Sequence, residues 1–236
     1  MSALMKNVLH IVFAVCYASL LSAPALAQTA VPPPPKPAGV GPSLAVTMQF
    51  IQDRMNNLGT VGYVRTDSNL AVTYRTYYII SGVVADPSAC TLQTTETTAW
   101  TIVPDEGHTY NEGGMPVTGD DLSRRHVETA TIRLRDIESI RVEPTQDAEI
   151  RRYAENAHPE ITVSIVPAVF YLTLVASKPV FNFHWTYTVG KQPAKEGDIS
   201  LKEDHLTFRD EETANRLAKA LTHAIELCGG GNKDPF

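Results

Sequence analysis

Cysteine and histidine side chains are the groups in this sequence that could hold a metal ion or act as a nucleophile. The three cysteines are Cys16, Cys90 and Cys228, and no histidine lies within four residues of Cys90 or Cys228. No Cys-x-x-Cys spacing occurs either. Because the local patterns of zinc sites are absent, the sequence predicts no metal site and no cofactor.

The histidines beyond residue 27 are scattered, and none has the spacing of a ligand pair. His184, on the polar face of a strand, is the best single candidate, although a hydrogen-bonded surface histidine is commoner there. His158 and Glu160 could pair a base with a carboxylate, but Pro159 holds that segment extended. Motifs of hydrolases, phosphate loops and EF-hands are absent, so no catalytic residue is predicted. The six histidines are His108, His126, His158, His184, His205 and His223.

Two groups of charged residues could bind an ion. Pro104–Arg125 is predicted to be a long surface loop, and its carboxylates could take a hard cation. Asp105-Glu106 and Asp120-Asp121 are too far apart in sequence for a known cation loop, so solvation is the simpler interpretation. Arg124-Arg125 and Arg151-Arg152 could share a basic patch, but their acidic neighbours favour mutual neutralisation.

The first 27 residues are predicted to be a secretory signal peptide. Lys6 supplies a positive charge, Val8–Leu21 form an apolar run, and Ala25 and Ala27 supply small residues before a cleavage point. The run is shorter than the roughly 20 apolar residues that a membrane span needs, and Pro24 ends it. We therefore expect an exported protein, periplasmic or extracellular, without stable membrane insertion after cleavage. An uncleaved anchor is the alternative.

Loss of Cys16 with the signal peptide leaves Cys90 and Cys228 as the remaining cysteines. In an oxidising compartment such a pair persists as a disulfide, and two cysteines allow one intramolecular connectivity. A disulfide between Cys90 and Cys228 is therefore predicted. A reactive thiol pair and half of a metal site are the alternatives.

The segment Gln28–Pro42 is rich in proline and is predicted to be a flexible, solvated tail. A proline-rich recognition motif is the alternative interpretation. Residues 43–228 are predicted to form a single β-rich domain, and residues 229–236, which begin with three glycines, a second flexible tail.

Both ends of the predicted domain are helical. Residues 43–57 carry apolar side chains at helical spacing, and Gly59 is placed to stop this helix. Residues 210–228 form a second amphipathic pattern with Asp210 as the N-cap. The disulfide would therefore attach the last helix to the strand that begins near Cys90.

Strand patterns dominate between the helices. Aromatic residues of 181–187 alternate with polar ones, which indicates one face on the core and one on solvent. Trp100 and Trp185 are predicted to lie in the core, Asp67–Asn69 to form a hairpin turn, and Glu143–Glu160 to form a short helix or another loop. The predicted strands are 60–66, 70–84, 92–103, 127–135, 137–142, 161–166, 169–176, 180–189, 198–201 and 205–208.

This order predicts a mainly β (α+β) fold: a single antiparallel bent sheet or barrel of about seven to nine strands, closed by the C-terminal helix, with an extra N-terminal helix. Strands that end in His205-Leu-Thr-Phe-Arg-Asp210, followed by one closing helix, resemble the pleckstrin-homology-like superfold over about Thr60–Cys228. The chain departs from that pattern because Glu211–Cys228 lacks a tryptophan and the first hairpin offers only Arg65 as a basic residue. The resemblance implies a binding or scaffolding module and carries no implication of a lipid ligand.

Composition and charge narrow the classes of function. Twenty Lys+Arg against 26 Asp+Glu give a formal net charge of −6, which disfavours a nucleic-acid partner. With 43% hydrophobic and 19% charged residues, disordered and multi-span membrane classes are excluded. We predict a secreted or periplasmic non-catalytic module for a protein or peptide partner, bound at an edge strand or in the groove beside the last helix. The alternatives are a lipocalin-like carrier of a small apolar ligand and, third, a hydrolase.

Overall fold

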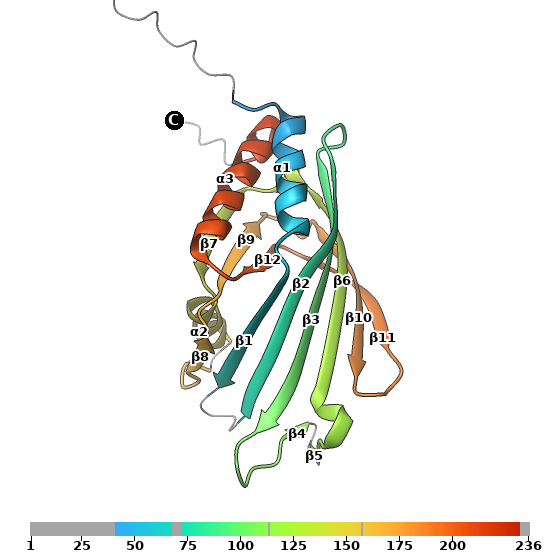
Figure 1. Cartoon of the computed structure of the whole chain (residues 1–236), viewed down its shortest axis with the longest axis vertical. Coiled ribbons are helices and arrows are strands. Elements are labelled where there is room, and N and C mark those ends of the chain that lie inside the picture. Colours follow the sequence, from blue (N-terminus) through green and yellow to red (C-terminus); the bar gives the residue numbers. More distant parts are fainter. Residues whose placement is uncertain (1–40, 68–71, 113, 157, 232–236) are drawn as a thin grey trace, which may run out of the picture. The chain divides into compact units, whose positions relative to one another are not determined.

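Seven antiparallel strands form the larger sheet of the protein. A computed structural model describes residues 41–67, 72–112, 114–156 and 158–231, all of which belong to one compact unit. Figure 1 shows the strands of this sheet side by side, in the spatial order β11–β10–β6–β3–β2–β1–β8. They are β1 (Thr60–Asp67), β2 (Val72–Asp86), β3 (Thr91–Pro104), β6 (Ser123–Arg133), β8 (Val163–Val166), β10 (Phe181–Val189) and β11 (Lys195–Leu201).

Three further strands form a smaller sheet in the order β12–β9–β7. These strands are β7 (Ser139–Pro144), β9 (Phe170–Val175) and β12 (Glu203–Phe208). Lys202 alone separates β11 from β12, and its carbonyl accepts a hydrogen bond of 2.9 Å from the Ala176 backbone N–H. The pairs β10–β11 and β9–β12 are therefore two halves of one long hairpin that bends from the larger sheet into the smaller one.

The prediction of a mainly β, antiparallel fold is confirmed, but the single sheet or closed barrel of seven to nine strands is wrong. The described residues contain twelve strands in three sheets, and the larger sheet ends at β11 and β8, which do not pair with each other. Residue alternation shows which face a strand buries, whereas the choice of partner depends on contacts far apart in the sequence. β9 pairs with β7 and β12 rather than with its sequence neighbour β8.

The predicted N-terminal helix is confirmed as α1 (Leu44–Asn56). The Ser43 hydroxyl accepts a hydrogen bond from the Val46 backbone N–H, and Gly59 has a positive φ of 68°. The Asn56 side chain exchanges two hydrogen bonds of 2.9 Å with the backbone of Val83, where β2 is bulged. This side chain satisfies backbone groups that the bulge removes from the strand ladder.

The ambiguous segment Glu143–Glu160 contains a helix, α2 (Thr145–Glu155). The Arg65 guanidinium of β1 joins this helix to the sheet through a two-pronged ion pair with Asp67, at 2.7 Å for each bond, and a bond of 2.8 Å to Glu149. The Tyr153 hydroxyl donates to Asp67 at 2.8 Å. Asp67 is fully buried, so its charge depends on these partners for compensation.

The last helix is α3 (Glu211–Leu227), and the Asp210 carboxylate accepts a bond of 2.7 Å from the Thr213 backbone N–H as predicted. α3 packs beside α1 and against the smaller sheet. Figure 1 shows α1 and α3 next to each other at the same end of the strands. None of the helices within the described ranges is long and apolar enough to cross a membrane.

The long loop predicted over Pro104–Arg125 is interrupted by structure. Arg124 is buried, and its guanidinium donates to the Glu112 carboxylate at 2.9 Å, which draws the segment back onto the sheet. β6 consequently begins at Ser123 rather than at Val127. The remaining elements here and after β6 are β4 (Asn111–Glu112), β5 (Met115–Pro116) and the 3-10 turns Gly119–Leu122 and Leu134–Asp136.

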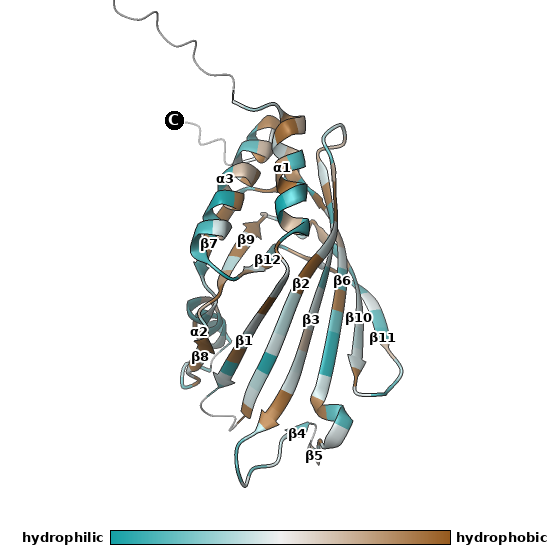
Figure 2. Cartoon of the chain, in the orientation of Figure 1, coloured by the Kyte–Doolittle hydropathy of each residue, from teal (hydrophilic) through white to brown (hydrophobic). Residues whose placement is uncertain are grey.

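One continuous apolar core joins α1, α3 and the two larger sheets. Figure 2 shows apolar and polar residues interspersed along the long strands, as expected when one face of a sheet is buried. Phe181 and Phe183 are buried while Asn182 and His184 are exposed, which confirms the predicted alternation for the first half of β10, whereas the residues from Trp185 to Thr188 are half-buried on both faces. Trp100 and Trp185 are only half-buried, contrary to the core placement predicted for them, because β3 and β10 extend beyond the part of the sheet that the helices cover.

The predicted disulfide joins Cys90 to Cys228, with the two Cα atoms 5.9 Å apart. It attaches the C-terminus of α3 to the residue before β3. Gly230 follows under close constraint, because a Cβ atom there would lie 2.7 Å from the Leu134 carbonyl oxygen. The Gly231 backbone N–H donates to the Ile137 carbonyl at 2.9 Å. The start of the predicted flexible tail 229–236 is therefore held in place by backbone hydrogen bonds, because the chain turns back onto the fold after the disulfide. The predicted signal peptide, residues 28–40 of the first predicted tail, residues 232–236 of the second and Ser68-Asn69 of the predicted hairpin turn lie outside the described residues.

Removal of the disulfide should lower stability substantially. A link between residues 138 positions apart restricts the unfolded chain, and chain entropy gives about 5 kcal/mol for such a loop. We expect the Cys90→Ser/Cys228→Ser variant to lose roughly 3–5 kcal/mol of unfolding free energy in urea denaturation. An unchanged denaturation midpoint would show that the link contributes nothing.

Loss of Arg65 should also be costly. Arg65→Leu leaves the buried Asp67 carboxylate without its two-pronged partner, and we expect a loss of about 3 kcal/mol in urea denaturation. Arg152→Leu is the matched control, because Arg152 also bonds Glu149 but its side chain is largely exposed. The control should lose less than about 1 kcal/mol. Equal losses in the two variants would contradict the role assigned to Arg65.

Candidate functional site

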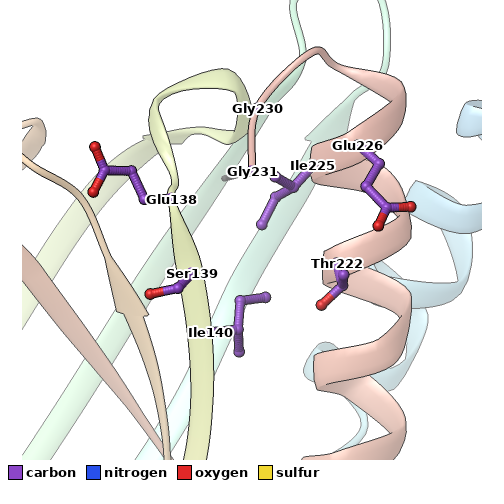
Figure 3. A pocket seen from close by; sticks show the side chains of 8 residues that line it. All are labelled: Glu138, Ser139, Ile140, Thr222, Ile225, Glu226, Gly230 and Gly231. Carbon is purple, nitrogen blue, oxygen red and sulfur yellow. The ribbon is translucent and has the colours of Figure 1, made fainter. Parts of the chain in front are cut away.

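A groove of about 440 Å³ lies between β7 and the C-terminal half of α3. Figure 3 shows its two walls: Ile140 points from β7 toward α3 while Ser139 points to the other side of the strand, and Thr222, Ile225 and Glu226 lie on α3. Glu138, Gly230 and Gly231 complete the lining. The groove is therefore apolar at its centre, where the two isoleucines lie, and polar at its rim.

β7 is an edge strand of the smaller sheet, and this edge faces the groove. Thr145 and Val169 continue the residue pairing of β7 with β9, and the Thr145 backbone N–H donates to the Val169 carbonyl. Since backbone groups of an antiparallel strand alternate in direction, Arg141 and Glu143 bond β9, and the N–H and C=O groups of Ile140 and Val142 point away from it. Pro144, which lacks an N–H, occupies the same outward-pointing series.

The closure at the C-terminus of α3 shapes one end of the groove. The disulfide at Cys228 holds the helix end against β3, and the chain then returns to the start of β7 through the hydrogen bond from Gly231 to Ile137. Gly230 permits this close approach because any side chain would overlap the Leu134 carbonyl and the Ile225 side chain. The cysteines and the glycine run together therefore fix the width of the groove at this end.

Charge in the groove is acidic. Its lining residues include the carboxylates of Glu138 and Glu226 and no lysine or arginine. Glu138 is half-buried and Glu226 is exposed, and Figure 3 shows both carboxylates turned away from the space between β7 and α3, so their charge lies at the outer rim of the groove. The groove therefore favours a ligand that combines an apolar side chain with a positive charge.

A second depression lies between α2 and the outer face of the smaller sheet. Its arginines are already paired: Arg151 with Glu143 at 2.6 Å, and Arg141 with Glu203 at 2.9 Å. Mutual neutralisation, as predicted for Arg151-Arg152, therefore describes this surface better than an anion site. Arg124 is likewise paired with Glu112.

The histidines remain dispersed in the fold. His184 contacts Asp198 at 3.1 Å on the exposed face of the larger sheet, and His158 contacts Glu160 at 3.4 Å. His126 lies against the rings of Trp185 and Tyr187. The three others bond the chain nearby or across the fold: His108 to the Glu106 carbonyl, His205 to Thr173 and His223 to the Pro42 carbonyl. Within the described part of the chain, no group of three potential metal ligands is assembled.

A cluster of buried carboxyl groups was not predicted from the sequence. Glu96 of β3 and Asp204 of β12 are 5% and 4% exposed, and one oxygen of each has no hydrogen-bond partner in the structure. The Tyr78 hydroxyl donates to the other Glu96 oxygen at 2.5 Å, and Glu128 and His126 lie beside the pair. The sequence offered one signal for this site. Glu96 lies four residues after the apolar Leu92 in β3, so alternation places both side chains on the same face of the strand.

Burial and like charge perturb these acids. Burial raises the pKa of Glu96 well above its usual range, and the charge of Asp204 adds to the effect. Burial and the charge of Glu128 raise the pKa of Asp204 to about 7. Burial also raises the pKa of Glu128, against the opposing effect of His126. The cluster therefore retains protons in the folded state at mildly acidic pH.

Comparisons with known proteins do not assign this chain to a group. No protein-family model matches it, and no curated protein matches it in sequence. The geometry of the groove and of the buried cluster is therefore the basis for any functional inference.

The acidic cluster should make stability depend on pH. Because the folded state holds a proton that the unfolded chain has released above about pH 4, the contribution of Asp204 is most favourable near pH 4 and declines as the pH rises toward 7. We expect Asp204→Asn to raise the unfolding free energy at pH 8 by a few kcal/mol more than at pH 4, measured by urea denaturation. Asp198→Asn, an exposed control on β11, should show no such difference. An equal effect of Asp204→Asn at the two pH values would contradict this linkage.

Proposed function

We propose that the protein is a non-catalytic binding module that takes an extended peptide as an added strand along β7, in the groove against α3. The observation that carries the proposal is the position of the β7 edge, which pairs with no other strand among the described residues, beside an apolar-centred groove. Backbone hydrogen bonds from Ile140 and Val142 would supply affinity, and the groove would accept every second side chain of the peptide. The proposal keeps the surface that the sequence suggested, the groove beside the last helix.

The lining residues define the chemistry of the peptide. One apolar side chain would pack between Ile140 and Ile225, and a lysine or arginine would pair with Glu138 or Glu226. Exported proteins meet their partners in the periplasm or the medium, and we place this binding there. The carrier alternative depends on an enclosed interior, and the open larger sheet gives it less support than the groove gives the peptide module.

A displayed library of random ten-residue peptides tests the proposal. We expect enriched sequences to combine an apolar residue with lysine or arginine, and to bind the intact protein. Thr222→Trp fills the groove from α3 and should weaken the selected peptides at least tenfold in fluorescence anisotropy. Arg216→Trp is the matched control, because Arg216 is an exposed residue of the same helix outside the groove lining.

The backbone component has its own measurement. N-methylation of alternate peptide residues should weaken binding at every second position and be tolerated between them, because only one series of amides faces β7. A library that yields no binder, or binders unaffected by Thr222→Trp, would reject the groove as the peptide site.

A further inference from the structure

β11 is an edge strand of the larger sheet and carries exposed apolar side chains. It pairs with β10 alone and ends the larger sheet (Figure 1). Ile199 and Leu201 on the core-facing side of this strand are 44% and 39% exposed. The edge therefore combines unpaired backbone groups with uncovered apolar surface, a combination that invites another strand.

The hydrogen bonds of β10 show which groups of β11 are free. Gly190 and Ser123 continue the residue pairing of β10 with β6, and the Gly190 backbone N–H donates to the Ser123 carbonyl. By alternation, His184 and Thr186 bond β6, and Phe183 and Trp185 bond their partners on β11, Ile199 and Gly197. The backbone groups of Asp198 and Ser200, between and after those partners, consequently point to the open edge.

The sequence along this edge is self-complementary in charge. In an antiparallel pair of two copies centred on Ile199, Glu196 of one copy lies opposite Lys202 of the other, and Asp198 opposite Ser200. Glu203 lies beyond the bend and is already paired with Arg141, so Glu196 and Lys202 are the complementary charges of this edge.

Other registers fit less well. A pair centred on Gly197 would place Glu196 opposite Asp198, and a pair centred on Asp198 would oppose the two Asp198 side chains. A pair centred on Ser200 would bring Glu196 opposite the buried Asp204, beyond the bend at Lys202. The Ser200 register would also oppose Asp198 and Lys202, but the Ile199 register uses more of β11 and places no like charges opposite each other.

The core-facing side of the edge is complementary as well. In the Ile199 register the two Ile199 side chains meet across the symmetry axis, and Leu201 of one copy lies over Gly197 of the other. Trp185 already covers Gly197, since a Cβ atom there would be 2.8 Å from the indole ring. Leu201 would therefore pack against an aromatic surface rather than against bare backbone.

We propose that two copies of this chain associate through antiparallel pairing of β11, about a twofold axis at Ile199. Charged residues on an edge strand often serve to prevent such pairing. Charges that served only to repel another strand would need no opposite charge at the facing position of a second copy. Here Glu196 of one copy faces Lys202 of the other. A single strand pair buries less surface than a standard interface, so the dimer should be weak, with a Kd on the order of 1–100 μM.

Sedimentation equilibrium of the oxidised, full-length mature chain at 1 μM to 1 mM tests the association. We expect Glu196→Lys and Lys202→Glu each to weaken the dimer at least tenfold, because like charges then face each other in both halves of the interface. The double variant Glu196→Lys/Lys202→Glu restores unlike pairs and should return the Kd to within about threefold of the parent. Far-UV circular dichroism confirms that each variant is folded.

Cross-linking tests the register independently. Ile199→Cys places two thiols opposite each other in a non-hydrogen-bonded pair, where Cα atoms are about 4.5 Å apart, and should yield a covalent dimer on mild oxidation. Thr101→Cys, on an exposed position of the central strand β3, is the control and should not. A chain that stays monomeric at 1 mM, no rescue in the double variant, or equal cross-linking of both cysteine variants would each overturn the proposal. None of these results depends on the groove at β7.

Discussion

Burial of one face of α3 is the contact on which the rest of the structure depends. Leu217, Leu221 and Ile225 lie on that face and are almost fully inaccessible to solvent, each contributing roughly 1.5–3 kcal/mol. They cover the apolar side of the smaller sheet and meet α1, so one helix completes two separate packing surfaces. The groove beside β7 exists because the same helix, held at its end by Cys228, runs close to the edge of that sheet without pairing with it.

The interior contains two contrasting solutions for buried charge. Around Arg65, every carboxylate has a cation or a hydroxyl within hydrogen-bond distance, so burial strengthens the network. Around Glu96 and Asp204, like groups face one another and two oxygens lack partners. The first arrangement fastens α2 to β1. The second trades stability at neutral pH for a polar centre between the two sheets, and perturbed acids of this kind often mark sites of function.

The sequence was sufficient to predict the local structure and insufficient to predict which strands pair with each other. Both terminal helices, their caps at Ser43 and Asp210, and the buried phenylalanines of β10 follow from residue type and spacing. The pairing of Cys90 with Cys228 follows from there being two cysteines beyond the predicted signal peptide. In contrast, the position of β9 between β7 and β12, and the half-burial of Trp100 and Trp185, depend on how far the helices reach over the sheet. The groove residues carried no sequence signal, because a strand edge is defined by the neighbour that is absent.

The long hairpin that bends at Lys202 has a mechanical consequence. One arm joins β9, the central strand of the smaller sheet, to β10, and the other joins β11 to β12, which are edge strands of the larger and the smaller sheet. A single pair of covalently continuous strands is therefore shared by both sheets. Displacing either sheet would strain the same peptide segments, which leaves little freedom for the sheets to hinge or slide as independent bodies. We therefore regard the domain as a stiff frame, one that presents the strand edges of β7 and β11 in a constant mutual orientation.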